Sequence, residues 1–183
     1  MSITIYGVAP STFVKTARMV CTEKGLDHEL EGFEFGSDGH QALHPFKKMP
    51  AANIDGDMVF ETTAIARRLE AMNPTPQLFP AGKAGIRNEL WASATADYLY
   101  RGMIPQLLGD TEPTVDLGAF DAGLATSEWF AGDAVGYADL LAAPIIGFGV
   151  FKKGDALLAD HPNLRRWQQA IMARPAVAEI LAA

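Results

Sequence analysis

An acid and a hydroxyl stand next to each other at the start of a helical pattern, and this pair is the first feature of the sequence that could do chemistry. Glu61 and Thr62 follow an apolar run and precede the helical spacing that begins at Ile65. The first backbone N–H groups of a helix have no partner within the helix, so such a corner can hold an anion. The sequence therefore predicts a binding site for a small anionic or peptide-like molecule at Glu61 and Thr62.

A β-hairpin must position this corner. Asp55-Gly56 lies between two apolar runs, and both central residues of a type I′ turn need positive φ, which Asp-Gly tolerates. Met49-Pro50 comes before the first run, and a proline suits the start or edge of a strand because it has no backbone donor. We expect a strand from Pro50, a tight turn, and a second strand that ends at the corner.

Other reactive side chains give weaker signals. Cys21 is the only cysteine, so an internal disulfide or a multi-thiolate metal site cannot form. It lies on the apolar face of the first expected helix, where a buried structural thiol is the better interpretation. The histidines show no metal-ligand spacing, and we expect no metal; they are His28, His40, His44 and His161.

Composition narrows the class of protein. The chain has 183 residues, of which 49% are hydrophobic and 20% charged, as is usual for a soluble globular protein of one or two domains. A net charge of −7 argues against a nucleic-acid partner. No signal-peptide pattern opens the sequence, and the longest apolar run, Leu140–Phe151, is too short to span a bilayer. We expect a cytoplasmic protein without a membrane partner.

The first 76 residues predict alternating strands and helices. Ile3–Tyr6 indicates a strand, and the helix after it begins near Ser11 or Thr12, either of which suits an N-cap. A second strand is expected within residues 26–35, before the hairpin. The order is βαβ followed by ββα, with the early pair of strands parallel because a helix connects them, and the last pair antiparallel.

The second half predicts helices only. Residues 77–85 continue a Pro/Gly-bearing segment that we interpret as a linker. The expected helices cover residues 86–108, 116–130 and 137–151, with one more from His161-Pro162 and a last short one from Pro175. This pattern predicts an α/β domain in residues 1–76, a linker in residues 77–85 and an all-helical domain in residues 86–183.

The order of elements and several short motifs resemble those of the cytosolic glutathione transferases. Each motif alone is weak, but five of them occur in the family's order and spacing over almost the whole chain. They are Met49-Pro50-Ala51, Asp55-Gly56, Glu61-Thr62, Gly132-Asp133 with Ala138-Asp139-Leu140, and His161-Pro162-Asn163-Leu164. The resemblance implies a thioredoxin-like N-terminal domain that binds glutathione and a helical domain that forms the wall of the second-substrate pocket.

The resemblance also implies a set of glutathione contacts. The Met49–Pro50 bond would be cis, so that the Met49 backbone pairs with the cysteinyl part of glutathione as an added strand would. Glu61 would bind the γ-glutamyl ammonium. Thr62, where the family usually has serine, would bind the γ-glutamyl carboxylate. Lys48 would either meet the negative end of the tripeptide or remain a solvated loop lysine.

Ser11 is the catalytic candidate, because it lies four residues after Gly7, as in the serine-using, phi-like members that the chain resembles. The nucleophile is the thiolate, yet a free thiol with a pKa of ~8.5 is mostly protonated at neutral pH. A hydroxyl that donates to the anion stabilises it by ~1.5–3 kcal/mol. The alternatives are that Ser11 is only an N-cap and that Thr12 or Tyr6 is the donor.

The implied activity is transfer of an alkyl or aryl group to glutathione, in detoxification of a small hydrophobic electrophile. Glutathione would be the co-substrate. The alternatives are a glutathione-dependent peroxidase or reductase, and a non-catalytic module for binding or dimerisation. We also expect a homodimer, with Phe46 as its candidate anchor, because some relatives insert an aromatic side chain at this position into the partner subunit.

Two departures from the family pattern bear on the second substrate and on folding. The segment between Leu108 and Gly132 is too short for the long second helix that most relatives carry, so the pocket should be shallow, open or partly closed by the dimer. Relatives also place serine or threonine three residues before Asp139. Gly136 stands there, so only half of a capping box remains.

Overall fold

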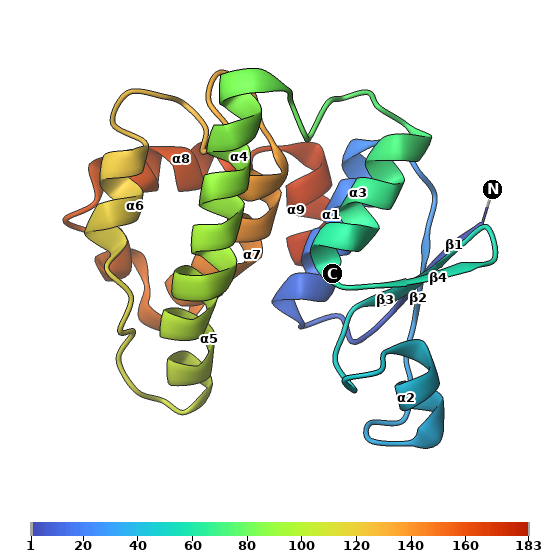
Figure 1. The fold of residues 1–183 in the computed structure, drawn as a ribbon. Helices are drawn as coiled ribbons and strands as arrows, with labels where there is room; N and C mark the ends of the chain where they lie inside the picture. The colour runs from blue at the N-terminus through green and yellow to red at the C-terminus, as the bar shows by residue number, and fades with distance from the viewer. Residues whose placement is uncertain (1, 183) are drawn as a thin grey trace. The chain divides into compact units, whose positions relative to one another are not determined.

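The computed structural model describes residues 2–182, which divide into two compact units (Figure 1). One unit ends at Gln77 and also includes the residues from Glu179 onward, and the other is Leu78–Ala178. The first unit contains a four-stranded sheet, and the second is helical.

The sheet of the first unit has the order β2-β1-β3-β4. Its strands are β1 (Ile3–Tyr6), β2 (Glu29–Glu31), β3 (Ala51–Ile54) and β4 (Asp57–Phe60). β1 and β2 are parallel, whereas β3 is antiparallel to both β1 and β4. The predicted thioredoxin-like βαβ-ββα order is confirmed, with one additional short helix, α2 (Asp38–Leu43), between β2 and β3.

The two longer helices of this unit, α1 (Thr12–Glu23) and α3 (Thr62–Met72), lie side by side and pack against each other (Figure 1). Each helix turns an apolar face inward. The residues without exposed surface include Val14, Ala17, Val20 and Cys21 in α1, and Ile65 and Leu69 in α3. α1 begins directly after Ser11, and α3 begins at Thr62, directly after Glu61. The packing of these two helices therefore positions the predicted site residues.

A buried lysine ties the far ends of α1 and α3 together. Lys24, at the end of α1, donates through Nζ to the carbonyl oxygens of Asn73 at 2.7 Å and Pro76 at 2.9 Å, and it forms an ion pair with Glu70. Asn73 returns a hydrogen bond from Nδ2 to the Lys24 carbonyl at 2.7 Å. A buried charge is stable only when it is paired and hydrogen-bonded in this way.

The helical unit begins with a long helical run in which a π-helical segment joins two α-helices. The run and the helices after it are α4 (Gly82–Ala94), η1 (Thr95–Tyr100), α5 (Arg101–Leu108), α6 (Leu117–Gly123), α7 (Tyr137–Lys153), the 3₁₀ turn η2 (Asp155–Leu158), α8 (Pro162–Met172) and α9 (Pro175–Ala182). The last residues of α9, from Glu179, belong to the first unit. The helix predicted for residues 116–130 is shorter than expected. Glycine at its two ends weakens helix formation, and its last turn closes against the ring of Trp91, which leaves no room for a side chain at Gly123. Within residues 2–182, no helix combines the length and the apolar character needed to cross a membrane.

Asp139 anchors the helical unit from the first turn of α7. Its carboxylate is fully buried and accepts four hydrogen bonds: from the backbone N–H of Phe130 (2.8 Å), Ala131 (3.3 Å) and Gly136 (3.0 Å), and from Trp167 Nε1 (2.8 Å). Burial raises the pKa of Asp139, and these hydrogen bonds act in the opposite direction. One side chain thus accepts hydrogen bonds from the backbone N–H groups of the loop before α7 and connects this loop to α8.

Asn88 of α4 supplies the capping oxygen that Gly136 cannot provide at the N-terminus of α7. Its Oδ1 accepts from the Ala138 N–H at 2.9 Å, and its Nδ2 donates to the Leu78 carbonyl at 3.2 Å. A Cβ at Gly136 would lie 2.5 Å from Asn88 Oδ1, so the serine or threonine of relatives would collide with this amide. Glycine is therefore required at this position, because the capping oxygen comes from another helix.

Candidate functional site

One end of the sheet gathers every site residue that the sequence indicated. The register pairs Tyr6 with Ala51, and Ala51 with Phe60. The loop after β1, the segment before β3 and the turn after β4 therefore all leave the sheet at the same end. These segments carry Ser11, Lys48, Met49, Pro50, Glu61 and Thr62.

The Met49–Pro50 peptide bond is cis, as the resemblance implied. Pro50 is buried, Met49 is half-buried and Lys48 is exposed. The ladder with β1 and β4 begins at Ala51, so the strand starts one residue later than predicted. Proline has no backbone donor to contribute to a ladder, which explains this boundary. The peptide groups just before β3 thus lie at the end of the sheet where β4 leads into Glu61 and Thr62.

The corner itself is built by Glu61 and Thr62. Glu61 has φ 72°, which is uncommon for a residue other than glycine, and backbone strain of this kind gathers at functional sites. Its side chain is 65% exposed, and its backbone carbonyl accepts the first hydrogen bond of α3, from the Ile65 N–H at 3.0 Å. Thr62 is buried as the first residue of α3. An exposed carboxylate thus borders the positive end of a helix, and this pair can hold a ligand that carries both charges.

Ser11 is the N-cap of α1, where its Oγ accepts from the Val14 N–H at 3.4 Å. A hydroxyl has one donor and two acceptor positions, so this cap leaves the O–H able to donate to a ligand. Ser11 can therefore be the N-cap of α1 and also the hydroxyl that donates to the sulfur of a bound thiol. The alternative donors differ in exposure, since Thr12 is buried and Tyr6 is half-buried.

Two buried histidines lie behind the corner, and sequence reasoning assigned them no role. His40 accepts from the Gly36 N–H at its Nδ1 (3.2 Å), so its Nε2 carries the proton that is donated to the Lys48 carbonyl (3.0 Å). Its ring stacks on Phe33 with centroids 4.1 Å apart. His40 thus holds the backbone directly before Met49. The available signal was two histidines spaced i, i+4, the second of them four residues before Lys48.

His44 connects two parts of the site. Its Nε2 lies 3.7 Å from Glu61 Oε1, and its Nδ1 accepts from the Phe46 N–H at 3.3 Å. The ring is buried between Phe60 and Phe46, with centroid distances of 5.0 and 6.2 Å. Burial lowers the pKa of His44, while the Glu61 carboxylate acts to raise it. A neutral imidazole with its proton on Nε2 directs that N–H toward Glu61, although 3.7 Å is longer than a hydrogen bond.

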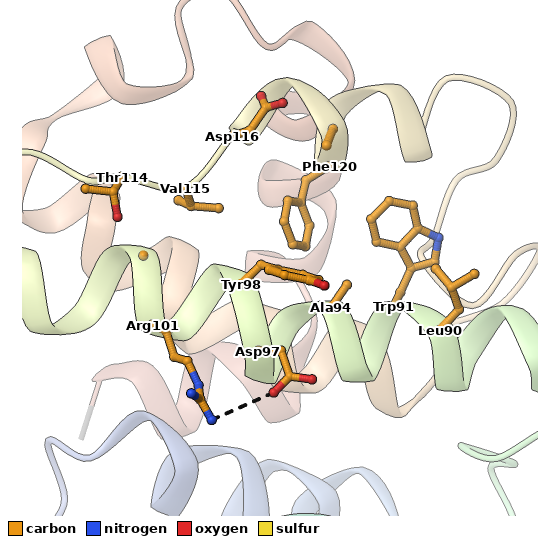
Figure 2. Close-up of a pocket in the computed structure, with 12 residues that line it drawn as sticks. Leu90, Trp91, Ala94, Asp97, Tyr98, Arg101, Thr114, Val115, Asp116 and Phe120 are labelled. Carbon is orange, nitrogen blue, oxygen red and sulfur yellow. Dashed lines mark ion pairs between the residues drawn. The ribbon is translucent and has the colours of Figure 1, made fainter.

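The helical unit contains a cavity of about 570 Å³ (Figure 2). Its walls are mainly apolar, and Figure 2 shows Phe120 of α6 facing Tyr98 of the long helical run, with Trp91 beside them. The Trp91 and Phe120 rings are 5.4 Å apart. Asp97 and Arg101 form an ion pair at 3.9 Å and point away from Phe120. Residues of α4, η1 and α5 form one wall of the cavity, and α6 with the segment before it forms the other.

Cys21 and the possible metal ligands of residues 2–182 form no second reactive centre. Burial raises the pKa of Cys21 to about 12, so this thiol remains protonated and unreactive at neutral pH. Within residues 2–182, His, Cys, Asp and Glu side chains form no group of three or more that could hold a metal ion.

Comparison with protein families agrees with this geometry. The model for the N-terminal domain of glutathione S-transferases matches residues 5–77, and the model for their C-terminal domain matches residues 109–175. The chain is 31% identical to glutathione S-transferase GstB of Escherichia coli over 204 residues, which covers 98% of this chain and 97% of that protein. It is 28% identical to glutathione S-transferase 1 of Triticum aestivum, over 97% of this chain and 93% of that protein.

Solved structures lead to the same fold. The apo form of glutathione S-transferase III superposes with a TM-score of 0.83 at 26% identity, over 100% of this chain and 97% of that chain. Poplar glutathione transferase F1 has a TM-score of 0.87 at 20% identity, over 100% of this chain and 97% of that chain, which is a likeness of fold. The similarity thus extends over both units.

Proposed function

This chain belongs to the cytosolic glutathione S-transferase family, and from that premise we propose that it activates glutathione as a thiolate for attack on a small hydrophobic electrophile. The family assignment carries the transferase activity. The observation that carries the proposed mechanism is the sheet register, which brings the Ser11 loop, the cis Met49–Pro50 bond and the Glu61–Thr62 corner to one end of the sheet.

We propose the following contacts for glutathione. The Glu61 carboxylate binds the γ-glutamyl ammonium, and Thr62 with the first N–H groups of α3 binds the γ-glutamyl carboxylate. The exposure of Glu61 and the helix N-terminus support this pair. The Met49 backbone pairs with the cysteinyl part, and Lys48 meets the negative end of the tripeptide. Ser11 donates to the sulfur.

Retention on immobilised glutathione tests this site. We expect the wild-type chain to be retained and Glu61→Ala to bind glutathione about 10-fold more weakly or worse, because the ligand ammonium loses a charged partner. Glu128→Ala is the matched control, since it removes an exposed acid from the helical unit. Failure of the wild-type chain to bind glutathione would overturn the proposal, and equal retention of the Glu61 and Glu128 variants would remove Glu61 from the site.

We further propose that the active form is a homodimer in the cytoplasm. Phe46 is 71% exposed, and a large aromatic side chain in that condition is a suitable anchor for a partner subunit. The cytoplasm keeps glutathione reduced, as a thiol co-substrate requires. Reduction of peroxides or disulfides by the same bound thiolate remains the alternative reaction.

A second candidate function is the carriage of flat aromatic ligands in the cavity of the helical unit. Its volume of about 570 Å³ lies in the range of small-molecule sites, and its aromatic walls suit an uncharged planar ring system. Its acids, Asp97 and Asp116, outnumber its one arginine, Arg101, which disfavours anionic ligands. Such binding requires no contribution from the glutathione corner.

Fluorescence titration with aminoanthracene, a flat uncharged fluorophore, tests this carriage. Ala94 lines the cavity, so Ala94→Phe should fill it and weaken binding about 10-fold or more. Ser93→Phe, at the neighbouring exposed position of α4, should bind as the wild-type chain does. Equal binding by the two variants would contradict the assignment. Retention on glutathione should be unchanged in both.

A further inference from the structure

His44 has an unusual position, because it is a buried ring in contact with an exposed carboxylate. An amide N–H can only donate, so the Phe46 N–H at 3.3 Å requires an unprotonated Nδ1. The proton of the neutral ring is then on Nε2, which faces Glu61 Oε1 at 3.7 Å. The tautomer is thus determined by the backbone of the loop that carries the proposed dimer anchor.

The ring cannot turn away from this direction without losing its packing. It is in contact with Phe60 and Phe46, and its side chain is 2% exposed. Glu61, by contrast, has a fixed backbone but a largely exposed side chain. A flexible exposed carboxylate must lose rotamer freedom before it can bind a ligand ammonium. The His44 Nε2–H, 3.7 Å from Glu61 Oε1, is beyond hydrogen-bond distance, but it attracts the carboxylate from a fixed point and so reduces that cost.

We infer that His44 is a positioning residue for glutathione binding, which orients the Glu61 carboxylate through its Nε2–H and couples that carboxylate to the Phe46 loop. The inference rests on the proposed function of the corner. It predicts an effect on the affinity for glutathione and little effect on the chemical step, because His44 contacts neither the sulfur nor the electrophile in this scheme.

Protonation of His44 should weaken glutathione binding. The imidazolium would place an N–H at Nδ1 against the Phe46 N–H, and it would compete with the ligand ammonium for Glu61. The charged groups around it are Glu61, which raises its pKa, and His40 and Lys48, which lower it, while burial lowers it most. Because the net shift is downward, the neutral form prevails at neutral pH. The affinity for glutathione should therefore be highest at neutral pH and should fall as the pH drops through the pKa of His44.

Two substitutions separate the functions of the two nitrogens. His44→Asn keeps an acceptor for an N–H two residues later but is too short to reach Glu61. His44→Gln keeps a donor near the position of Nε2 and does not titrate. We expect His44→Asn to raise the KM for glutathione about 3- to 10-fold with kcat within about twofold, and His44→Gln to restore most of that KM. Both variants should lose the acid-side rise in KM.

A double-mutant cycle with Glu61→Gln completes the test. His44→Asn should add nothing to the KM of Glu61→Gln if it acts through that carboxylate. An unchanged KM and pH profile in His44→Asn would overturn the inference, and so would equal losses in KM and kcat, or a full further loss in the Glu61→Gln background. Absence of glutathione binding by the wild-type chain would instead overturn the proposed function.

Discussion

Replacing Ser11 by glycine is expected to slow conjugation at neutral pH about 10- to 100-fold, since a hydrogen bond to an ionised group is worth about 1.5–3 kcal/mol. The physical reason is the pKa of the bound thiol. Without the hydroxyl donor the thiolate is less stable, so the thiol pKa rises by about one to two units. Less of the bound glutathione is then ionised at neutral pH, and the rate falls in proportion.

Glycine is the informative substitution because Ser11 is also the N-cap of α1. Serine to alanine at an N-cap costs about 1 kcal/mol of stability, whereas glycine costs only a few tenths. Ser11→Thr keeps both the cap and the donor and should retain most of the activity. Thr12→Val and Tyr6→Phe remove the two alternative donors and serve as matched tests of the assignment.

The pH–rate profile is the measurement that decides the role of Ser11. If Ser11 stabilises the thiolate, the profile of kcat/KM for an aryl halide shifts to higher pH in Ser11→Gly, and the variant approaches the wild-type rate once the pH exceeds the new thiol pKa. A profile with an unchanged midpoint would remove Ser11 from this role. A shift in Thr12→Val or Tyr6→Phe instead would transfer the role to that residue.

Local sequence signals predicted the local geometry well. Asp55-Gly56 predicted a turn with positive φ at both residues, and the observed values are 53° and 95°. Ser11 was one of two candidate caps, and it is the cap. Such features depend on a few neighbouring residues, so the pattern contains the information that determines them.

Features that depend on partners distant in sequence could not be predicted in the same way. Asn88 caps a helix that begins about 50 residues later, and no spacing rule connects the two. His44 had no visible role until the fold brought Glu61 to it. Lys24 is an ordinary helix-end lysine in sequence, and only the packing of α1 on α3 buries it. In each case the polar atom has a role because burial requires a partner for it.

The same reasoning predicts the largest change in stability for Asp139→Ala. We expect this variant to lose about 3–5 kcal/mol of unfolding free energy, because it leaves buried donors on three backbone groups and on Trp167 without their acceptor. Asp139→Asn should be nearly as damaging, since an amide turns one of the acceptor atoms into a donor that faces other donors. Asp133→Ala, at an exposed acid in the same loop, should change the free energy by no more than about 0.5 kcal/mol.

Denaturant unfolding followed by tryptophan fluorescence measures this loss in the unit concerned. All three tryptophans, Trp91, Trp129 and Trp167, lie within Leu78–Ala178, so their emission reports on the helical unit. An Asp139→Ala midpoint equal to that of Asp133→Ala would contradict the anchoring role. If Asp139→Ala loses this unfolding free energy, Asp139 affects catalysis only through the fold. Variants of Glu61 and Thr62 should instead unfold with the wild-type fluorescence midpoint. The difference in midpoint between the two kinds of variant separates stability from function in this chain.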